Sequence, residues 1–247
     1  MDKFLAGGMT LIPILKQRLA RPTHLIDLSG TQELSGIHLD GRGLVIGAMT
    51  THSTVAGSPE VRRTIPALAM LAASIGDPQV RNRGTLGGSI VNNDRAADYA
   101  AGGVALGATV VTDRRSIPAD TFFSGMFETV LEPDGLVTAV IFPIPVMAGY
   151  AKVRQTALRY PLMGVGVTRS RMAARAAVIG AALNVFRHTE MEAALDETFS
   201  PEALEHIQTP EDRLHADTHG SAAYRANLVD VVAKRAVIAA CTSAAGR

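Results

Sequence analysis

The chain has 247 residues and a mass of 26.0 kDa, which is enough for one or two domains with a sizeable core. Hydrophobic residues make up 47% and charged residues 19%, a composition typical of globular proteins and not of disordered ones. Lys and Arg total 24 against 23 Asp and Glu, so no basic surplus favours nucleic acid as the main partner. The single cysteine, Cys241, excludes an internal disulfide and an iron–sulfur cluster held by this chain alone.

The first residues contain no apolar stretch of the kind found in a signal peptide. The longest nearly uncharged run, residues 176–186, is about half of the ~20 residues that a membrane span needs, and it indicates a buried strand or core segment. Together with the lone cysteine, these features predict a cytoplasmic protein without a transmembrane segment.

Short apolar runs bounded by turn or cap residues predict strands, which we expect at residues 24–28, 44–48, 109–111 and 136–142. Three helices are expected in the same part of the chain: a short one capped by Thr50, Thr51 or Ser53, then residues 65–75 and 98–106. The helix over 65–75 has Pro66 in its first turn and Gly76 at its end, which is the usual placement of these residues. This first part of the chain therefore resembles an α/β unit.

Pro143 and Pro145 cannot continue the strand before them, and we expect a domain boundary there. The predicted domains span residues 1–145 and 146–247. The second is expected to contain a strand over 150–156 and two apolar runs, followed by helices that make it an α+β tail of about 100 residues. The last helix, residues 221–240, is expected to bury one face formed by Leu228, Val231, Val232 and Ile238.

Two Gly-Gly turns have small polar neighbours. The first, Ala-Gly-Gly-Met-Thr at residues 6–10, precedes an apolar helical run over 11–19, and the second is Thr-Leu-Gly-Gly-Ser at residues 85–89. Paired glycines allow successive backbone N–H groups to converge on an anion, and a helix beginning at Thr10 would add partial positive charge. Two such loops about 80 residues apart could bind the two phosphates of one dinucleotide. The alternative is that each is an ordinary tight turn.

Other motifs are weaker. Neither glycine loop has the spacing of a Rossmann or P-loop motif. His215 and His219 are four residues apart but lack the Glu of a zinc-protease motif, so we expect a capping or surface segment and no metal site. No nucleophile elbow or Cys–His pair is present, and no catalytic residue is predicted. From the residues alone, Asp98 is expected to cap a helix, and a role as ligand to a sugar hydroxyl is the less favoured interpretation. Lys152 is expected to be a solvated charge on an edge strand.

In combination, these residues resemble the FAD-binding medium subunit of molybdenum hydroxylases, the heterotrimers of the carbon monoxide dehydrogenase and xanthine dehydrogenase type. Both Gly-Gly motifs, in this order and with residues 92–99 behind the second, carry the resemblance. Nearly the whole chain takes part, with further similar segments at residues 20–28, 46–52, 79–84, 106–111 and 219–225.

The resemblance implies an α+β chain. Residues 1–145 would form a PCMH-type (vanillyl-alcohol-oxidase-like) FAD-binding domain of two α/β subdomains, and residues 146–247 a small α+β domain of the CO-dehydrogenase-flavoprotein C-terminal type. FAD would lie between the two subdomains.

The resemblance also implies the cofactor contacts. Backbone amides of both glycine loops would bind the pyrophosphate, at Ala6, Gly7, Gly8, Met9, Thr10, Thr85, Leu86, Gly87, Gly88 and Ser89. Asp98 would lie beside the sugar-like chain of the flavin and Val137 would pack near the isoalloxazine ring. Lys152 would lie near the polar edge of the flavin, where a cation stabilises the reduced form.

The implied activity is electron transfer within an oxidoreductase complex, and the chain is not expected to turn over substrate alone. A large subunit would carry the molybdenum cofactor, a small subunit would carry two [2Fe–2S] clusters, and FAD would pass electrons to an acceptor such as NAD⁺, a quinone or O₂. The complex would be a dimer of heterotrimers. The lone cysteine agrees with placing the metal centres on other chains.

Three features depart from the family pattern. Ser89 stands where many relatives have Asn, and Arg95 replaces a common Pro, which predicts a looser loop before Asp98. The chain also opens shortly before Gly7, apparently without roughly 25–30 residues that relatives have there, a loss that would expose apolar surface. Two alternatives therefore stay open: a truncated scaffold subunit that no longer binds FAD, and a stand-alone flavoprotein oxidoreductase of the same fold. The substrate of the complex, whether CO, an aldehyde, a purine or another N-heterocycle, is not determined by this sequence.

Overall fold

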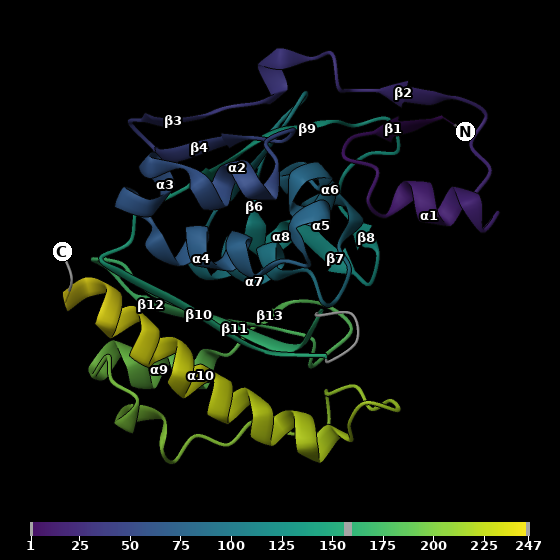
Figure 1. Cartoon of the computed structure of the whole chain (residues 1–247). Coiled ribbons are helices and arrows are strands. Elements are labelled where there is room, and N and C mark those ends of the chain that lie inside the picture. The colour runs from purple at the N-terminus through teal and green to yellow at the C-terminus, as the bar shows by residue number, and fades with distance from the viewer. Residues whose placement is uncertain (1, 156–159, 246–247) are drawn as a thin grey trace.

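The computed structural model describes residues 2–155 and 160–245. The chain begins with a small unit in which strand β1 (Lys3–Leu5) pairs in parallel with β2 (Leu25–Asp27), and helix α1 (Leu11–Lys16) connects them. A short 3₁₀ turn, η1 (Gln32–Leu34), leads into the rest of the molecule. Figure 1 shows this unit at one end of the first sheet.

A five-stranded antiparallel sheet follows, in the order β3-β4-β9-β5-β6. Its strands are β3 (Ile37–Asp40), β4 (Gly43–Gly47), β9 (Val137–Phe142), β5 (Thr109–Thr112) and β6 (Ser116–Pro118). The strands predicted over 44–48, 109–111 and 136–142 are confirmed to within a residue or so. The sheet joins strands nearly a hundred residues apart in sequence, because β4 pairs with β9.

Helices cover one face of this sheet (Figure 1). They are α2 (His52–Gly57), α3 (Pro59–Thr64), α4 (Pro66–Ser74), α5 (Pro78–Arg83), α6 (Leu86–Asn92), α7 (Asp98–Leu106) and α8 (Ala119–Phe122), with a hairpin of β7 (Phe123–Gly125) and β8 (Glu128–Thr129) beside them. Local capping explains several boundaries, since the side chains of Thr51 and Ser58 accept the amides of Thr54 and Val61. The helices predicted over 65–75 and 98–106 are confirmed, whereas α5 and α6 were not predicted.

The second part contains an antiparallel sheet with helices on its outer face. The strands, in order, are β10 (Met147–Arg154), β11 (Pro161–Arg169), β12 (Ala174–Ile179) and β13 (Phe186–Arg187), and the helices are α9 (Thr189–Glu197), the 3₁₀ turn η2 (Glu202–Leu204) and α10 (Ala222–Ala245). Figure 1 shows this sheet between α7 on one face and α10 on the other. Residue 156, the end of the strand predicted over 150–156, lies outside the described residues.

Side chains on β10 and β11 alternate between the two faces of this sheet, as the period of a strand requires. Met163, Val165 and Val167 join the core under α10, whereas the intervening Gly166 lies against α7, where a Cβ would meet the carbonyl oxygen of Ala101 at 3.2 Å. Ala177 and Ile179 of β12 belong to the core of the first part. The two parts therefore share packed surface, and a domain division between residues 145 and 146 stays a prediction.

Two segments end earlier than the sequence predicts. The helix expected over 11–19 ends at Lys16, because Arg18 takes a left-handed conformation and the Leu19 amide bonds back to the Ile14 carbonyl. The apolar run 176–186 continues β12 only as far as Ile179, where the chain turns, and only its last residue, Phe186, is again in a strand, β13. No helix in the described residues is both long and apolar enough to cross a membrane.

The buried face of α10 was predicted only in part. Val232 is buried and Leu228 packs partly buried against the core, but Val231 and Ile238 are exposed. The face against the sheet is composed mainly of small residues: Ala226, Val229, Val232, Ala233, Ala236, Val237 and Ala240. Small side chains allow the helix to approach the sheet so closely that a Cβ on Gly149 would clash with the Ala236 carbonyl oxygen.

Candidate functional site

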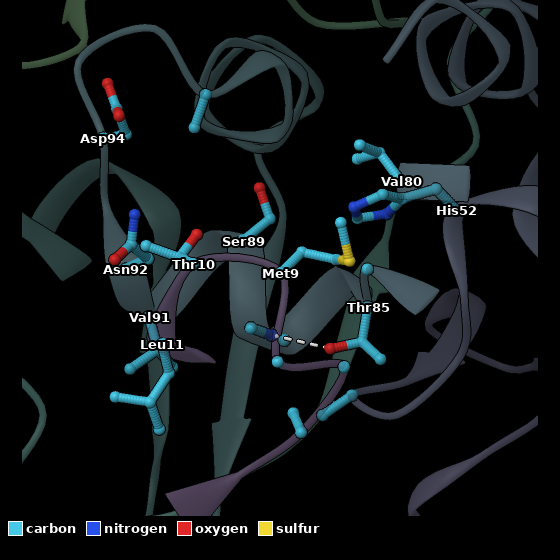
Figure 2. A pocket seen from close by; sticks show the side chains of 18 of the residues that line it. Met9, Thr10, Leu11, His52, Val80, Thr85, Ser89, Val91, Asn92 and Asp94 are labelled. Carbon is cyan, nitrogen blue, oxygen red and sulfur yellow. Dashed lines mark hydrogen bonds between the residues drawn. The ribbon is translucent and has the colours of Figure 1, made fainter. Parts of the chain in front are cut away.

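A cavity of about 1010 Å³ opens where the loop before α1, the N-terminus of α6, the loop before α7 and the start of β9 meet. Its volume is at the upper end of the range for small-molecule sites. Both Gly-Gly loops lie on its wall (Figure 2). Of the thirteen predicted contact residues, those that line it are Ala6, Gly7, Gly8, Met9, Thr10, Thr85, Gly87, Gly88, Ser89, Asp98 and Val137.

The first loop needs both of its glycines. A Cβ on Gly7 would lie 1.9 Å from the carbonyl oxygen of Arg83, and Gly8 has a φ of +76°. Within the described chain, the backbone amides of residues 7–10 donate to no other group, and the Thr10 side chain does not cap α1. Four consecutive free amides beside a cavity form the kind of cradle that binds a phosphate oxygen.

The second loop is different. The amides of Leu86 and Gly87 donate to the carbonyl oxygens of Thr50 and Ala48 over 3.0 and 2.8 Å, so they are already used within the fold. The Gly88 amide donates to the hydroxyl of Thr85 over 3.2 Å, the bond drawn in Figure 2. The expectation that both loops present successive free amides is therefore met by the first loop alone. The second contributes the hydroxyl groups of Thr85 and Ser89 at the cavity wall.

Asp98 is not the cap of its helix, because Ala97 occupies the N-cap position and Asp98 is the first helical residue. Its Oδ1 accepts hydrogen bonds from the Tyr150 hydroxyl and the Lys152 ammonium group, both at 2.6 Å. Lys152 is 4% exposed, so the interpretation as a solvated edge charge was wrong. Burial raises the pKa of Asp98 and lowers that of Lys152, each against the pull of the partner's charge.

Two predicted contacts lie off the cavity wall. Lys152 meets the cavity only through Asp98, and Leu86 is a fully buried core side chain. Val137, the first residue of β9, lies on the wall with other apolar and aromatic residues that the sequence analysis did not single out: Phe127, Leu131, Leu136 and Tyr160. These side chains give that part of the cavity an apolar lining suited to a planar ring.

The loop between α6 and α7 is tied at Arg95. The Arg95 guanidinium donates to Asp217 Oδ2 over 2.9 Å, and the Arg95 carbonyl accepts the Gly180 amide over 2.9 Å. The expectation that this loop would be loose is therefore wrong. Asp217 lies in the His215–His219 segment, predicted to be a surface or capping segment. No group of His, Cys, Asp and Glu that could hold a metal occurs among the residues that the structure describes.

His52 lines the cavity, although it was not predicted as a site residue from the sequence. It is the first residue of α2, 4% exposed, and its ring packs on Tyr99 with centroids 5.3 Å apart. Burial, assisted by the positive charge of Arg81, lowers the pKa of His52 to about 4, so the ring is neutral at pH 7. No local signal in the sequence distinguishes it from a polar residue on a helix surface.

The fold and the cavity together define a class of protein, an α+β protein with a glycine loop suited to phosphate on the wall of a large cavity. Residues 2–145 match the family model for the FAD binding domain in molybdopterin dehydrogenase. The chain belongs to this family, and FAD is its cofactor.

Curated relatives extend the match over nearly the whole chain. The carbon monoxide dehydrogenase medium chain of Hydrogenophaga pseudoflava is 34% identical over 257 residues, covering 96% of this chain and 88% of its own. The nicotine 6-hydroxylase medium subunit of Paenarthrobacter nicotinovorans is also 34% identical, covering 97% and 89%. A solved structure of the Hydrogenophaga pseudoflava carbon monoxide dehydrogenase, a form that lacks the Mo-pyranopterin moiety, superimposes with a TM-score of 0.85, covering 98% of this chain and 90% of that one.

The residues of the cavity fit FAD. Free amides at residues 7–10 suit its phosphate oxygens, and the Asp98 carboxylate suits a hydroxyl group. The apolar lining around Val137 suits its ring system. The α+β fold predicted from the sequence, with an FAD-binding domain of this family, is confirmed.

Proposed function

We propose that the chain is the FAD-carrying electron-transfer subunit of a heterotrimeric molybdenum hydroxylase. In this role it receives electrons from [2Fe–2S] clusters of a small subunit and passes them through FAD to a final acceptor such as NAD⁺, a quinone or O₂. The observation that carries the proposal is the row of four free backbone amides at residues 7–10, facing a cavity large enough for a dinucleotide. Bound FAD supplies the ability to accept single electrons and release a pair.

The residues of the chain bind and orient the cofactor. The first glycine loop binds the pyrophosphate through residues 7–10, and the hydroxyl groups of Thr85 and Ser89 complete the contact from the other side. Asp98 accepts a hydrogen bond from the sugar-like chain, because Tyr150 and Lys152 share Oδ1 and leave Oδ2 to other donors. Lys152 acts through Asp98 and keeps that carboxylate in position.

Partner chains supply the other redox centres. The lone Cys241 cannot hold an iron–sulfur cluster, so electrons reach this subunit from another chain. Relatives named as medium chain or medium subunit indicate a complex with a larger and a smaller component. We infer a molybdenum-binding large subunit, a [2Fe–2S] small subunit and a dimer of such heterotrimers in the cytoplasm. The substrate is set elsewhere, because relatives named for carbon monoxide and for nicotine are equally similar to this chain.

Purification of the chain with an affinity tag from its natural host tests the proposal. We expect two further subunits to copurify, iron and molybdenum in the complex, and flavin absorption bands near about 370 and 450 nm at one FAD per chain. A complex without flavin would instead identify a scaffold subunit, and a flavoprotein without partners a stand-alone oxidoreductase. Either result would overturn the proposal.

A further inference from the structure

Two buried rings beside the cavity carry polar atoms that have no hydrogen-bond partner in the described chain. These atoms are Nδ1 of His52 and the hydroxyl oxygen of Tyr99. The two rings pack on each other at an interplanar angle of 45°. A buried polar group without a partner destabilises a folded protein, so each such group needs an explanation.

Only one of the two rings reaches the cavity. His52 lines it and Tyr99 does not. Figure 2 shows the imidazole of His52 reaching into the pocket on the same side as Val80 and Thr85, with the Met9 side chain pointing toward it. Neither ring nitrogen of His52 has a hydrogen-bond partner among the described residues, and Nδ1 is fully buried.

The position of His52 is fixed by the backbone. Its amide donates to the Gly84 carbonyl over 3.0 Å, and a Cβ on Gly84 would come within 2.6 Å of His52 Nε2. The residue before Gly84 is Arg83, whose carbonyl lies against Gly7 of the first glycine loop. Thr85, directly after Gly84, opens the second loop. The imidazole therefore lies where the two glycine loops meet.

We propose that His52 is a binding residue for FAD, through a hydrogen bond from its imidazole to the dinucleotide at the junction of the two glycine loops. The proposal rests on FAD as the occupant of the cavity. A neutral imidazole carries one N–H donor, which can bond to an oxygen of the cofactor, and one acceptor, which can bond to a hydroxyl. Nδ1 is fully buried, so the bond to FAD is formed by Nε2, the ring nitrogen that is not among the fully buried unpaired atoms.

This arrangement predicts opposite effects on stability and on binding, which a merely structural histidine would not produce. Replacement of His52 by Leu removes an unpaired polar group, so the apoprotein melts at the same or a higher temperature. The same replacement removes a bond to the cofactor, so the dissociation constant for FAD rises about tenfold or more. His52→Gln keeps a donor and an acceptor and is expected to bind FAD within about threefold of the wild-type protein.

The experiment uses the full chain as it purifies, with any partner subunits retained, stripped of flavin and titrated with FAD by flavin fluorescence. Thermal unfolding is measured with and without FAD. Tyr99→Phe is the matched control, because it removes an equally buried, equally unpaired group that does not line the cavity. We expect it to raise the melting temperature of the apoprotein and to leave FAD binding unchanged.

Wild-type FAD affinity in His52→Leu, with the full FAD-induced rise in melting temperature, would overturn the proposal. A second measurement covers a variant that fails to fold: the ¹⁵N resonances of the His52 ring in the wild-type chain should shift on FAD addition, and unchanged resonances would also overturn it. Failure of the wild-type protein itself to bind FAD would instead refute the proposed function on which the inference rests.

Discussion

Arg95 and Asp217, 122 residues apart in sequence, form an ion pair at 2.9 Å that joins the cavity loop to the second part of the molecule. Asp217 also accepts a hydrogen bond from Arg225, whose side chain is 2% exposed and donates further to the Gly180 and Leu162 carbonyls. One carboxylate thus holds two arginines from different elements. Because Arg95 belongs to the loop that leads into Asp98, this network connects the second sheet to the wall of the FAD cavity.

Replacement of Asp217 by Asn should destabilise the protein strongly. The substitution leaves Arg225 charged and buried without a counterion, and breaking a buried pair in this way costs about 3–5 kcal/mol. Burial alone would raise the pKa of Asp217, but the His219 amide and the Arg225 guanidinium outweigh it and hold that pKa far below its usual range. Chemical denaturation at pH 7 measures the loss, and a loss below about 1 kcal/mol would show that water reaches Arg225.

Arg95→Ala tests the link between the network and the cofactor. It removes a partly exposed pair, so we expect a loss of only about 1 kcal/mol in the free energy of unfolding but a weakening of FAD binding by a few-fold, because the loop before Asp98 is no longer held. The surface pair of Arg63 and Glu60 on α3 provides the control, since Arg63→Ala removes an ion pair whose two residues do not line the cavity. Equal FAD affinities in the two variants would argue against a positioning role for Arg95.

Gly7→Ala should abolish or severely weaken FAD binding. A Cβ on Gly7 would lie 1.9 Å from the Arg83 carbonyl oxygen, so the first loop must move away from the second and the cradle of free amides is lost. FAD titration by fluorescence measures the effect, which we expect to exceed about tenfold in the dissociation constant. Gly30→Ala is the matched control, since a Cβ there meets nothing within 4 Å. Normal binding by Gly7→Ala would mean that the loop is not part of the site.

The buried ion pair of Asp98 and Lys152 should contribute more to the stability of the fold than the ion pairs on the surface do. Asp98→Asn leaves the Lys152 ammonium group buried with only neutral partners, and we expect a loss of about 3–5 kcal/mol in the free energy of unfolding. The double variant Asp98→Asn, Lys152→Met removes the unpaired charge and should recover most of that stability, while FAD binding stays weakened. Denaturation curves of the two variants, with FAD titrations beside them, distinguish charge burial from cofactor contact.

The sequence predicted what depends on short-range signals. Thr51 caps α2 through the Thr54 amide three residues away, and such a bond can be inferred from neighbouring residues. The two glycine loops were found in the same way, because glycine pairs with small polar neighbours indicate close approach of a backbone to a ligand. Their meeting at one cavity followed from the resemblance to a family and not from spacing.

What the sequence could not predict depends on contacts between distant segments. The buried face of α10 is set by alanines that approach Gly149, and alanine gives a weaker amphipathic pattern than the larger Val and Ile on which the prediction relied. Asp217 looked like part of a polar turn because its two arginine partners lie elsewhere in the chain. Lys152 looked solvated because its strand faces Asp98 only after the second sheet packs on α7. The amides of the first glycine loop are free, whereas those of Leu86 and Gly87 in the second are bonded, because the carbonyl groups just after β4 lie beside the second loop and accept them.

Acid should destabilise the protein through His52. The pKa of His52 is about 4 in the folded protein and close to 6.5 in the unfolded chain, so protons bind preferentially to the unfolded state as the pH falls. The contribution of His52 to stability is therefore complete above pH 6.5 and is lost between about pH 6.5 and 4, an effect of about 3 kcal/mol. Burial lowers the pKa of His188 in the same direction, so the wild-type protein loses stability from both residues.

His52→Gln separates the two contributions, because its side chain does not titrate and all other groups are shared with the wild-type protein. Denaturation at pH 7 and at pH 4.5 should give a smaller difference in the free energy of unfolding for His52→Gln than for the wild-type chain, by about 2–3 kcal/mol. His188→Gln should reduce the difference too, but without affecting FAD affinity, since His188 is the N-cap residue of α9 and does not line the cavity. An unchanged pH dependence in His52→Gln would mean that the ring gains water or a partner on protonation, and the environment inferred for His52 would then be wrong.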